Sequence, residues 1–135
     1  MVKEESKHEQ QDRERLHAFR EGKGDCYVIL QLTPEAEKQG LLFLSSASLL
    51  FHKQKPQFAN YHCVYNGQFI IQGLQRIDVL NTLYRQFNIF APGDFHGHIL
   101  SVSDIILLKL HGEITCWYID PHGYARLTDF LPAIY

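Results

Sequence analysis

Residues 87–131 decide the fold, and they read FNIFAPGDFHGHILSVSDIILLKLHGEITCWYIDPHGYARLTDFL. A polar loop rich in Gly, Pro and Asp occupies residues 88–100, and a nearly unbroken apolar run follows at 104–110. Such a run is typical of a central strand with both faces covered. The dipeptide His111-Gly112 then predicts a turn, and residues 113–120 alternate as an antiparallel partner strand should.

The remaining segments extend this pattern in both directions. We expect strands over 26–32, 41–44, 61–65, 69–72 and 124–127, with Asn66-Gly67 as a hairpin turn. Short helices are expected after Thr33 and after Ser45 or Ser46. A longer one starts at Asp78, with one apolar face formed by Ile77, Leu80, Leu83, Tyr84 and Phe87. The sequence therefore predicts a single α+β domain, with a mainly antiparallel sheet of about 4–6 strands and two or three short helices.

The first 24 residues differ from the rest. Residues 1–25 hold 13 of the 28 charged residues, six basic and seven acidic, and their sizeable apolar side chains are Val2, Leu16 and Phe19. Such a segment buries too little surface to offset its ordering entropy. We expect 1–24 to be a charged, flexible arm that forms at most one exposed helix, and 25–135 to be the folded domain.

The composition restricts which partners and which cellular compartment we expect for this protein. The net charge is −2, and the seven basic residues of 26–135 are scattered, so we expect no direct binding of nucleic acid. No apolar run reaches the ~18 residues that cross a membrane. The three cysteines, Cys26, Cys63 and Cys116, have no Cys-x-x-Cys spacing, and the N-terminus lacks an apolar signal core. These features indicate a soluble protein of the reducing cytoplasm.

One family shares the order of these motifs. The matching features are Tyr27 to Leu32, Tyr65-Asn66-Gly67, the helix ending in Phe87-Asn88-Ile89, the block from Pro92 to Asp104, and the tail from Tyr118 to Leu131. Over residues 26–131 the chain resembles the YodL-type domain of Firmicutes and their mobile elements. His96, His122, Cys116 and the N-terminal arm depart from the family pattern, so no family role transfers to them.

The resemblance implies a function only by analogy. YodL-type domains have no established enzymatic activity and resemble accessory domains of mobile elements. We therefore expect a small, non-enzymatic inhibitor that binds a protein target, as a monomer or weak dimer. Counter-defence against a CRISPR or restriction nuclease (anti-CRISPR activity, for example) is the first expectation. Modulation of a host actin-like cytoskeletal protein is the alternative.

Candidate binding residues cluster in the central loop and the strand after it. We expect the protein contacts to come from Asp94, Phe95, His98, Ser101, Ser103, Asp104 and Trp117. His98 with Ser101, Ser103 and Asp104 superficially suggests a nucleophile and a base, but catalytic triads are recognised by geometry. Hydrogen bonds that shape the loop are the stronger interpretation. A positive φ would explain the glycine at Gly97.

Metal binding is a separate hypothesis. His96 and His98 flank Gly97, and Cys116 and His122 lie one hairpin further on, so zinc could be held by some of His96, His98, Cys116 and His122. The usual Cys-x-x-Cys or His-x-x-x-His spacings are missing. We expect no cofactor, with zinc as the alternative. A metal-dependent enzyme that uses His98 and Asp104 is the corresponding alternative function.

Overall fold

One antiparallel sheet organises the chain. The computed structural model describes residues 7–68 and 75–132. Its elements follow in the order α1 (Lys7–Glu21), β1 (Cys26–Leu32), α2 (Pro34–Lys38), α3 (Ser46–Phe51), the 3-10 turn η1 (Phe58–Asn60), β2 (Tyr61–Gln68), α4 (Arg76–Ile89), β3 (Ile105–Leu110), β4 (Glu113–Asp120) and β5 (Gly123–Leu127). The strand order across the sheet is β2-β1-β3-β4-β5, with every neighbouring pair antiparallel.

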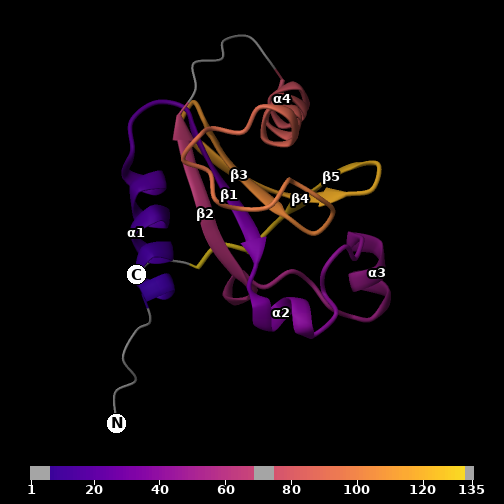
Figure 1. The fold of residues 1–135 in the computed structure, drawn as a ribbon. Coiled ribbons are helices and arrows are strands. Elements are labelled where there is room, and N and C mark those ends of the chain that lie inside the picture. Colours follow the sequence, from indigo (N-terminus) through magenta and orange to yellow (C-terminus); the bar gives the residue numbers. More distant parts are fainter. Residues whose placement is uncertain (1–6, 69–74, 133–135) are drawn as a thin grey trace.

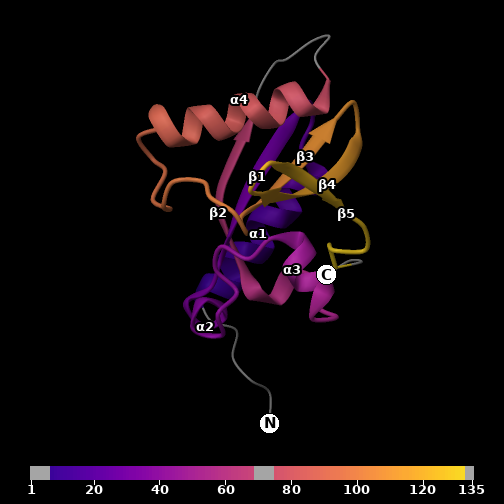
Figure 2. The same ribbon diagram turned by 90° about the vertical axis from the view of Figure 1, so that its right-hand side faces the viewer.

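Helices cover both faces of this sheet. Helix α4 lies across one face and α1 along the other, while α2 and α3 lie at the lower end of the sheet (Figures 1 and 2). Ala36 of α2 and Leu49 of α3 belong to the same buried cluster as Leu16 and Phe19 of α1. Two buried clusters follow from this arrangement. Residues of β1 alternate between them, with Val28 and Leu30 facing α1 and Tyr27 and Ile29 facing α4. The sheet is therefore covered on both sides, which explains why all seven residues of β1 are buried.

The expected α+β class and its antiparallel sheet are confirmed. Five strands lie within the predicted range, and the described residues contain four α-helices where two or three were expected. The meander β3–β4–β5 has the predicted turns, with His111 and Gly112 in the left-handed region at φ 51° and 81°. Along β4 the predicted alternation holds, since Cys116 and Tyr118 belong to one cluster and Ile119 to the other.

The expected flexible arm is instead a packed helix over residues 7–21. In α1, Leu16 and Phe19 are 0% and 2% exposed and join the core beneath β1. Polar contacts hold the helix as well. The Asp12 carboxylate accepts the Cys63 amide at 2.8 Å, and Arg15 donates to the Cys63 carbonyl at 2.5 Å. The charged residues thus pair with the backbone of edge strand β2, which composition alone does not reveal.

The C-terminal end of α1 is held by a cation. Lys109 Nζ, on β3, donates to the carbonyl oxygens of Arg20 and Gly22 at 2.7 Å each. A lysine there stabilises the last carbonyls and the negative end of the helix dipole. Arg20 in turn donates to the carbonyl of Pro132. The helix is therefore tied to the sheet and to the chain's last described residues.

One predicted strand and one predicted turn were wrong. Residues 41–44 form a turn between α2 and α3. Asn66 and Gly67 lie inside β2, where Gly67 pairs with Tyr27. A Cβ on Gly67 would come within 2.2 Å of the Tyr27 ring, so this glycine makes room for an aromatic ring on the neighbouring strand. The expected return strand 69–72 falls outside the described residues.

The long helix begins earlier than predicted. Gln75 is the N-cap of α4, and Asp78 is the third residue of a capping box that closes on the Gln75 backbone. Leu80, Leu83 and Phe87 are buried as expected, whereas Ile77 is 47% exposed.

A substitution in α1 tests whether this helix packs on the domain. Replacing Leu16 with Ala removes a fully buried side chain, and we expect the free energy of unfolding to fall by about 2 to 5 kcal/mol. Chemical denaturation measures this loss. His17→Ala, at the neighbouring exposed position, should change stability by less than about 0.5 kcal/mol. Equal stabilities of the two variants would show that the helix does not pack on the domain.

Candidate functional site

The central loop is joined to the sheet by Gln31, a polar residue in the otherwise apolar strand β1. Its side chain is buried, and its Nε2 donates to the His98 carbonyl at 2.8 Å and to Asp104 Oδ2 at 3.2 Å. Its Oε1 accepts the His98 amide at 3.1 Å. One carboxamide thus fixes both ends of the segment 98–104. A buried amide needs such partners, because leaving it unpaired costs free energy.

This geometry also sets the tautomer of His98. Its Nδ1 lies 2.7 Å from the Ile99 carbonyl and 3.1 Å from Gln31 Nε2. A proton on Nδ1 satisfies the carbonyl, and the two hydrogens of Gln31 Nε2 then serve the His98 carbonyl and Asp104. When the imidazole is neutral, this leaves His98 Nε2 as an acceptor, on a side chain that is 42% exposed.

Asp104 is the buried end of the network. It is 0% exposed, its Oδ2 accepts the Ser101 amide at 3.0 Å, and its Oδ1 has no hydrogen-bond partner among the described residues. Burial raises the pKa of this carboxyl to about 7, and the nearby Glu37 adds to the rise. His98, the Ser101 amide and Gln31 oppose it. Asp104 thus remains largely protonated in mild acid.

The neighbouring serine has a structural role. Ser103 is fully buried at φ 85°, its Oγ accepts the Phe43 amide at 3.1 Å, and its carbonyl accepts the Tyr61 hydroxyl at 2.7 Å. Its amide donates to the Ile119 carbonyl at 3.0 Å. The predicted role of these side chains in shaping the loop therefore matches their contacts, and neither Ser103 nor Asp104 is accessible to a partner in this conformation.

The first half of the loop rests on aromatic rings. Phe95 packs edge-on against Phe87 and Tyr65, with ring centroids 4.9 and 5.9 Å apart. The Tyr65 hydroxyl donates to Asp94 Oδ1 at 3.1 Å. Phe95 is thus half-buried and anchors the loop, while Asp94 and His98 are exposed. Trp117 is half-buried on β4, and its indole N–H donates to Thr115 Oγ1 at 2.8 Å.

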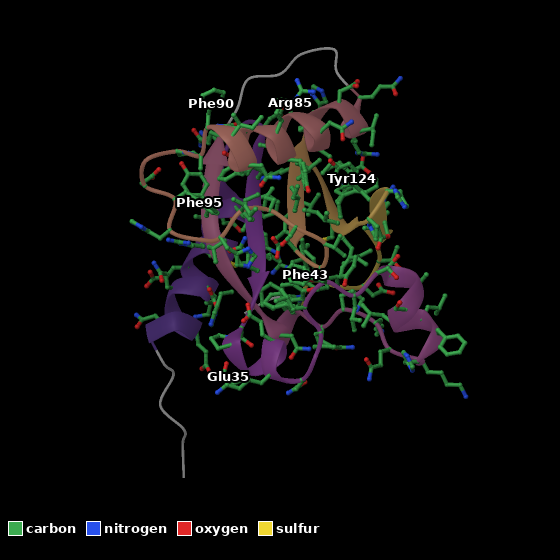
Figure 3. All side chains as sticks on the ribbon, turned by 45° about the vertical axis from the view of Figure 1, so that its right-hand side comes forward. Glu35, Phe43, Arg85, Phe90, Phe95 and Tyr124 are labelled. Carbon is green, nitrogen blue, oxygen red and sulfur yellow. The ribbon has the colours of Figure 1, made fainter. Side chains whose placement is uncertain are left out.

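Exposed apolar side chains near this loop escaped the sequence analysis. Ile89, Phe90 and Ile99 are 61%, 80% and 64% exposed. They belong to the same part of the fold, because Asn88 Oδ1 accepts the Leu100 amide at 2.7 Å and so joins the end of α4 to the end of the loop. Figure 3 shows Phe90 projecting outward where α4 ends. We call Ile89, Phe90 and Ile99 the α4-end surface.

The four residues proposed for zinc do not form a cluster. Cys116 lies on β4 with its side chain buried in the core, whereas His96, His98 and His122 are exposed on loops. Among the described residues, no group of three His, Cys, Asp or Glu side chains is arranged to hold a metal ion. Burial raises the pKa of the Cys116 thiol to about 11, which opposes the thiolate that zinc requires.

A pocket lies apart from the central loop, beside α3. It measures about 690 Å³ and lies between α2, α3 and the segment 53–57, with Tyr61 and Tyr118 among its lining residues. Neither His98 nor Asp104 lines it. Sequence analysis missed this pocket because its walls come from segments that are far apart in the chain.

The fold and the anchored loop define a class: an α+β domain built on one open antiparallel sheet, with a central loop that is hydrogen-bonded to the sheet. The family model of the YodL-like domain matches residues 26–130, so the chain belongs to the YodL-like domain family. Helix α1 precedes the matched region. No curated protein and no solved structure matches the chain. In the described part of the chain, no helix has the length and apolar character needed to cross a membrane.

Gly97 gives a test of the loop. Its φ is outside the left-handed region, so the positive φ expected from sequence is not the reason for this glycine. Space is the reason, since a Cβ would come within 2.4 Å of Gln31 Oε1 and 2.7 Å of Phe95 Cζ. We expect Gly97→Ala to lower the free energy of unfolding by about 1 to 3 kcal/mol in chemical denaturation.

Gly93→Ala is the matched control. Apart from its two chain neighbours, no described residue has a heavy atom within 4 Å of a Cβ at Gly93, so this variant should retain nearly the wild-type stability. Equal stability of the Gly97→Ala and Gly93→Ala variants would contradict the close approach of Gln31.

Asp104 predicts a pH dependence of stability. Its pKa in the folded protein, about 7, lies above the ordinary value of 3.8, so the folded state binds the proton more tightly than the unfolded state. The contribution of this carboxyl to the free energy of unfolding is fully present below pH 3.8 and is lost as the pH rises toward 7. Each unit of pKa difference corresponds to about 1.4 kcal/mol.

We therefore expect Asp104→Asn to reduce the fall in stability between pH 5 and pH 8, as measured by thermal denaturation at several pH values. Asp94→Asn, at an exposed position, should retain the wild-type pH profile. An Asp104→Asn profile as steep as that of the wild type would show that another group titrates.

Proposed function

We propose that this domain acts by binding a protein through the α4-end surface. Three large apolar side chains that are each more than half exposed support this. Clustered exposed apolar residues are typical of interaction sites, and aromatic residues are enriched in interface cores. The loop beneath them is held by Gln31, Asn88 and Tyr65, so little ordering entropy is lost on binding.

Polar groups beside this surface supply specificity. Of the residues expected from sequence to make protein contacts, Asp94 and His98 are exposed on the same loop and are available to a partner. Phe95, Ser101, Ser103 and Asp104 position the loop, and Trp117 is half-buried on the sheet. The proposed contact set is therefore Ile89, Phe90, Asp94, His98 and Ile99.

Binding without catalysis is part of the same proposal. The alternative of a metal-dependent enzyme requires a substrate to reach both His98 and Asp104, and Asp104 is fully buried beneath its loop. The three free cysteines, all buried, suit a protein of the reducing cytoplasm. The cytoplasm is therefore the location that we propose.

For the target, we favour a bacterial defence nuclease of the CRISPR or restriction type. Membership of the YodL-like family is the support for this choice, together with an exposed apolar surface on a small domain. An actin-like filament protein is the alternative target. Either target would be inhibited by occupation of its surface.

Direct binding measurements test the proposal. The purified chain is titrated by biolayer interferometry against purified CRISPR nucleases, restriction nucleases and an actin-like filament protein. We expect saturable binding to one target, and Phe90→Ser should weaken it at least about tenfold, as loss of a central aromatic contact does. Phe51→Ser is the matched control, because Phe51, the last residue of α3, is 82% exposed and Phe90, which directly follows α4, is 80% exposed.

The two variants separate the possible outcomes. Equal loss of affinity in both would indicate nonspecific hydrophobic binding and would exclude the α4-end surface. A target held equally well by wild type and by Phe90→Ser would place the interface elsewhere. Retention of none of the tested proteins would reject both proposed target classes.

A further inference from the structure

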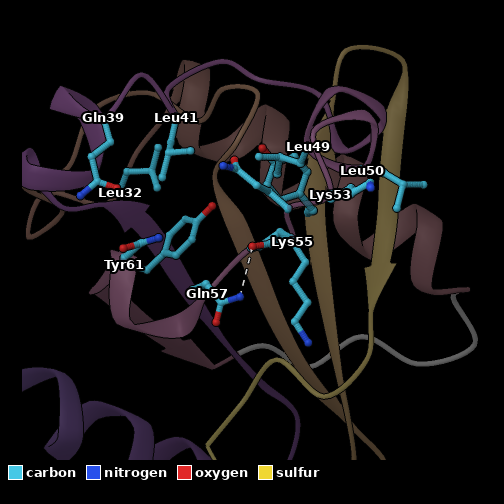
Figure 4. Close-up of a pocket in the computed structure, with 13 residues that line it drawn as sticks. Leu32, Gln39, Leu41, Leu49, Leu50, Lys53, Lys55, Gln57 and Tyr61 are labelled. Carbon is cyan, nitrogen blue, oxygen red and sulfur yellow. Dashed lines mark hydrogen bonds between the residues drawn. The ribbon is translucent and has the colours of Figure 1, made fainter.

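The pocket beside α3 carries an inference that does not depend on the α4-end surface. Figure 4 shows it as a hollow bounded by the end of α2, helix α3 and the segment that leads to Gln57. Its volume of about 690 Å³ falls in the range typical of pockets for small molecules, which is roughly 300–1,000 Å³. The proposed protein surface lies on another loop and shares no residue with it.

The inner wall of this pocket is apolar. Leu32, Leu49, Tyr61 and Tyr118 line it and are each at most 6% exposed. Both tyrosine hydroxyls are already used as donors, Tyr61 to the Ser103 carbonyl at 2.7 Å and Tyr118 to the Leu44 carbonyl at 2.5 Å. These four residues therefore present mainly aromatic and aliphatic carbon atoms to a ligand.

The wall is held in place by the rest of the fold. Ser45 caps α3 by accepting the Ser48 amide at 3.0 Å, and Asp120 accepts the Ser46 amide and hydroxyl at 2.7 and 2.6 Å. Helix α3 is thus anchored to the end of β4. The pocket exists before any ligand arrives, which lowers the entropy lost on binding.

The rim of the pocket is positively charged. Among the described residues that line it, Lys53 and Lys55 are the only ionisable ones apart from the two tyrosines, and the remaining polar ones are the neutral amides Gln39, Gln54, Gln57 and Asn60. Both lysines are exposed, and neither forms a salt bridge with another described residue. Two ammonium groups beside an apolar wall complement an anion attached to an apolar body.

We propose that this pocket binds a small amphipathic anion, with its apolar body against Leu32, Leu49 and Tyr61 and its carboxylate or phosphate head beside Lys53 and Lys55. Leu50 extends the apolar wall to the mouth of the pocket, where it is 75% exposed. An aliphatic chain of moderate length fits this combination of a carbon-lined interior and a cationic rim.

The test uses three ligands with the same decyl chain. Isothermal titration calorimetry with decanoate, decyl phosphate and decylammonium, all below their micellar concentrations, compares the head groups. We expect saturable binding of the two anions and at least about tenfold weaker binding of decylammonium. Decanoate and decyl phosphate then distinguish a carboxylate from a phosphate head.

Variants locate the binding site. Lys53→Gln combined with Lys55→Gln should weaken decanoate at least about tenfold, because the partners of the head group are lost. Lys38→Gln removes an exposed lysine of α2 that does not line the pocket, and it should bind like the wild type. Leu50→Glu alters an exposed side chain, so it should leave the fold intact while its charge repels the anion.

Three results would overturn the proposal. One is equal affinity for decanoate and decylammonium, and another is unchanged decanoate binding in both the double lysine variant and Leu50→Glu. The third is failure of both anions to bind at about 1 mM. In that third case, binding of an acidic peptide from a protein would assign the pocket to a macromolecular partner instead.

Discussion

The carboxamide of Gln31 is the contact on which the central loop depends. It is buried within strand β1, and it holds His98 and Asp104 at the two ends of one short segment. Burial makes these hydrogen bonds a strict requirement, because a lost partner leaves an unpaired polar group inside the protein. Gly97 is needed for the same reason, since Gln31 Oε1 occupies the space that any side chain there would take. The loop in turn supports the exposed residues for which we propose a protein contact.

Much of the fold could be predicted from local patterns. The meander from β3 to β5 combines glycine turns with alternating apolar residues. The side chains of the N-caps Thr33 and Ser45 each accept the backbone amide three residues further along. Such signals are complete within the segment that carries them. The prediction failed where residues distant in sequence determine the local structure. At Asn66-Gly67, pairing with β1 overrides the strong turn preference of this dipeptide.

The site was predictable only in part. Sequence analysis identified the loop and the structural role of Ser103 and Asp104, yet it assigned these two buried residues to a contact surface as well. It missed Phe90 and Ile99, because an exposed apolar residue in a loop has no periodicity to distinguish it from a buried one. The pocket beside α3 was also missed, since its lysines come from one segment and its inner wall from four others, β1, α3, β2 and β4.

Helix α1 covers part of the sheet's edge along β2. An edge strand offers unpaired N–H and C=O groups on which further chains can add. Asp12 and Arg15 satisfy the amide and the carbonyl of Cys63, so a helix takes the place of a sixth strand along part of β2. Because α1 precedes β2 in the chain, the ribosome synthesises this helix before the edge strand that it covers. The helix is therefore available to cover the edge of β2 when the nascent sheet forms.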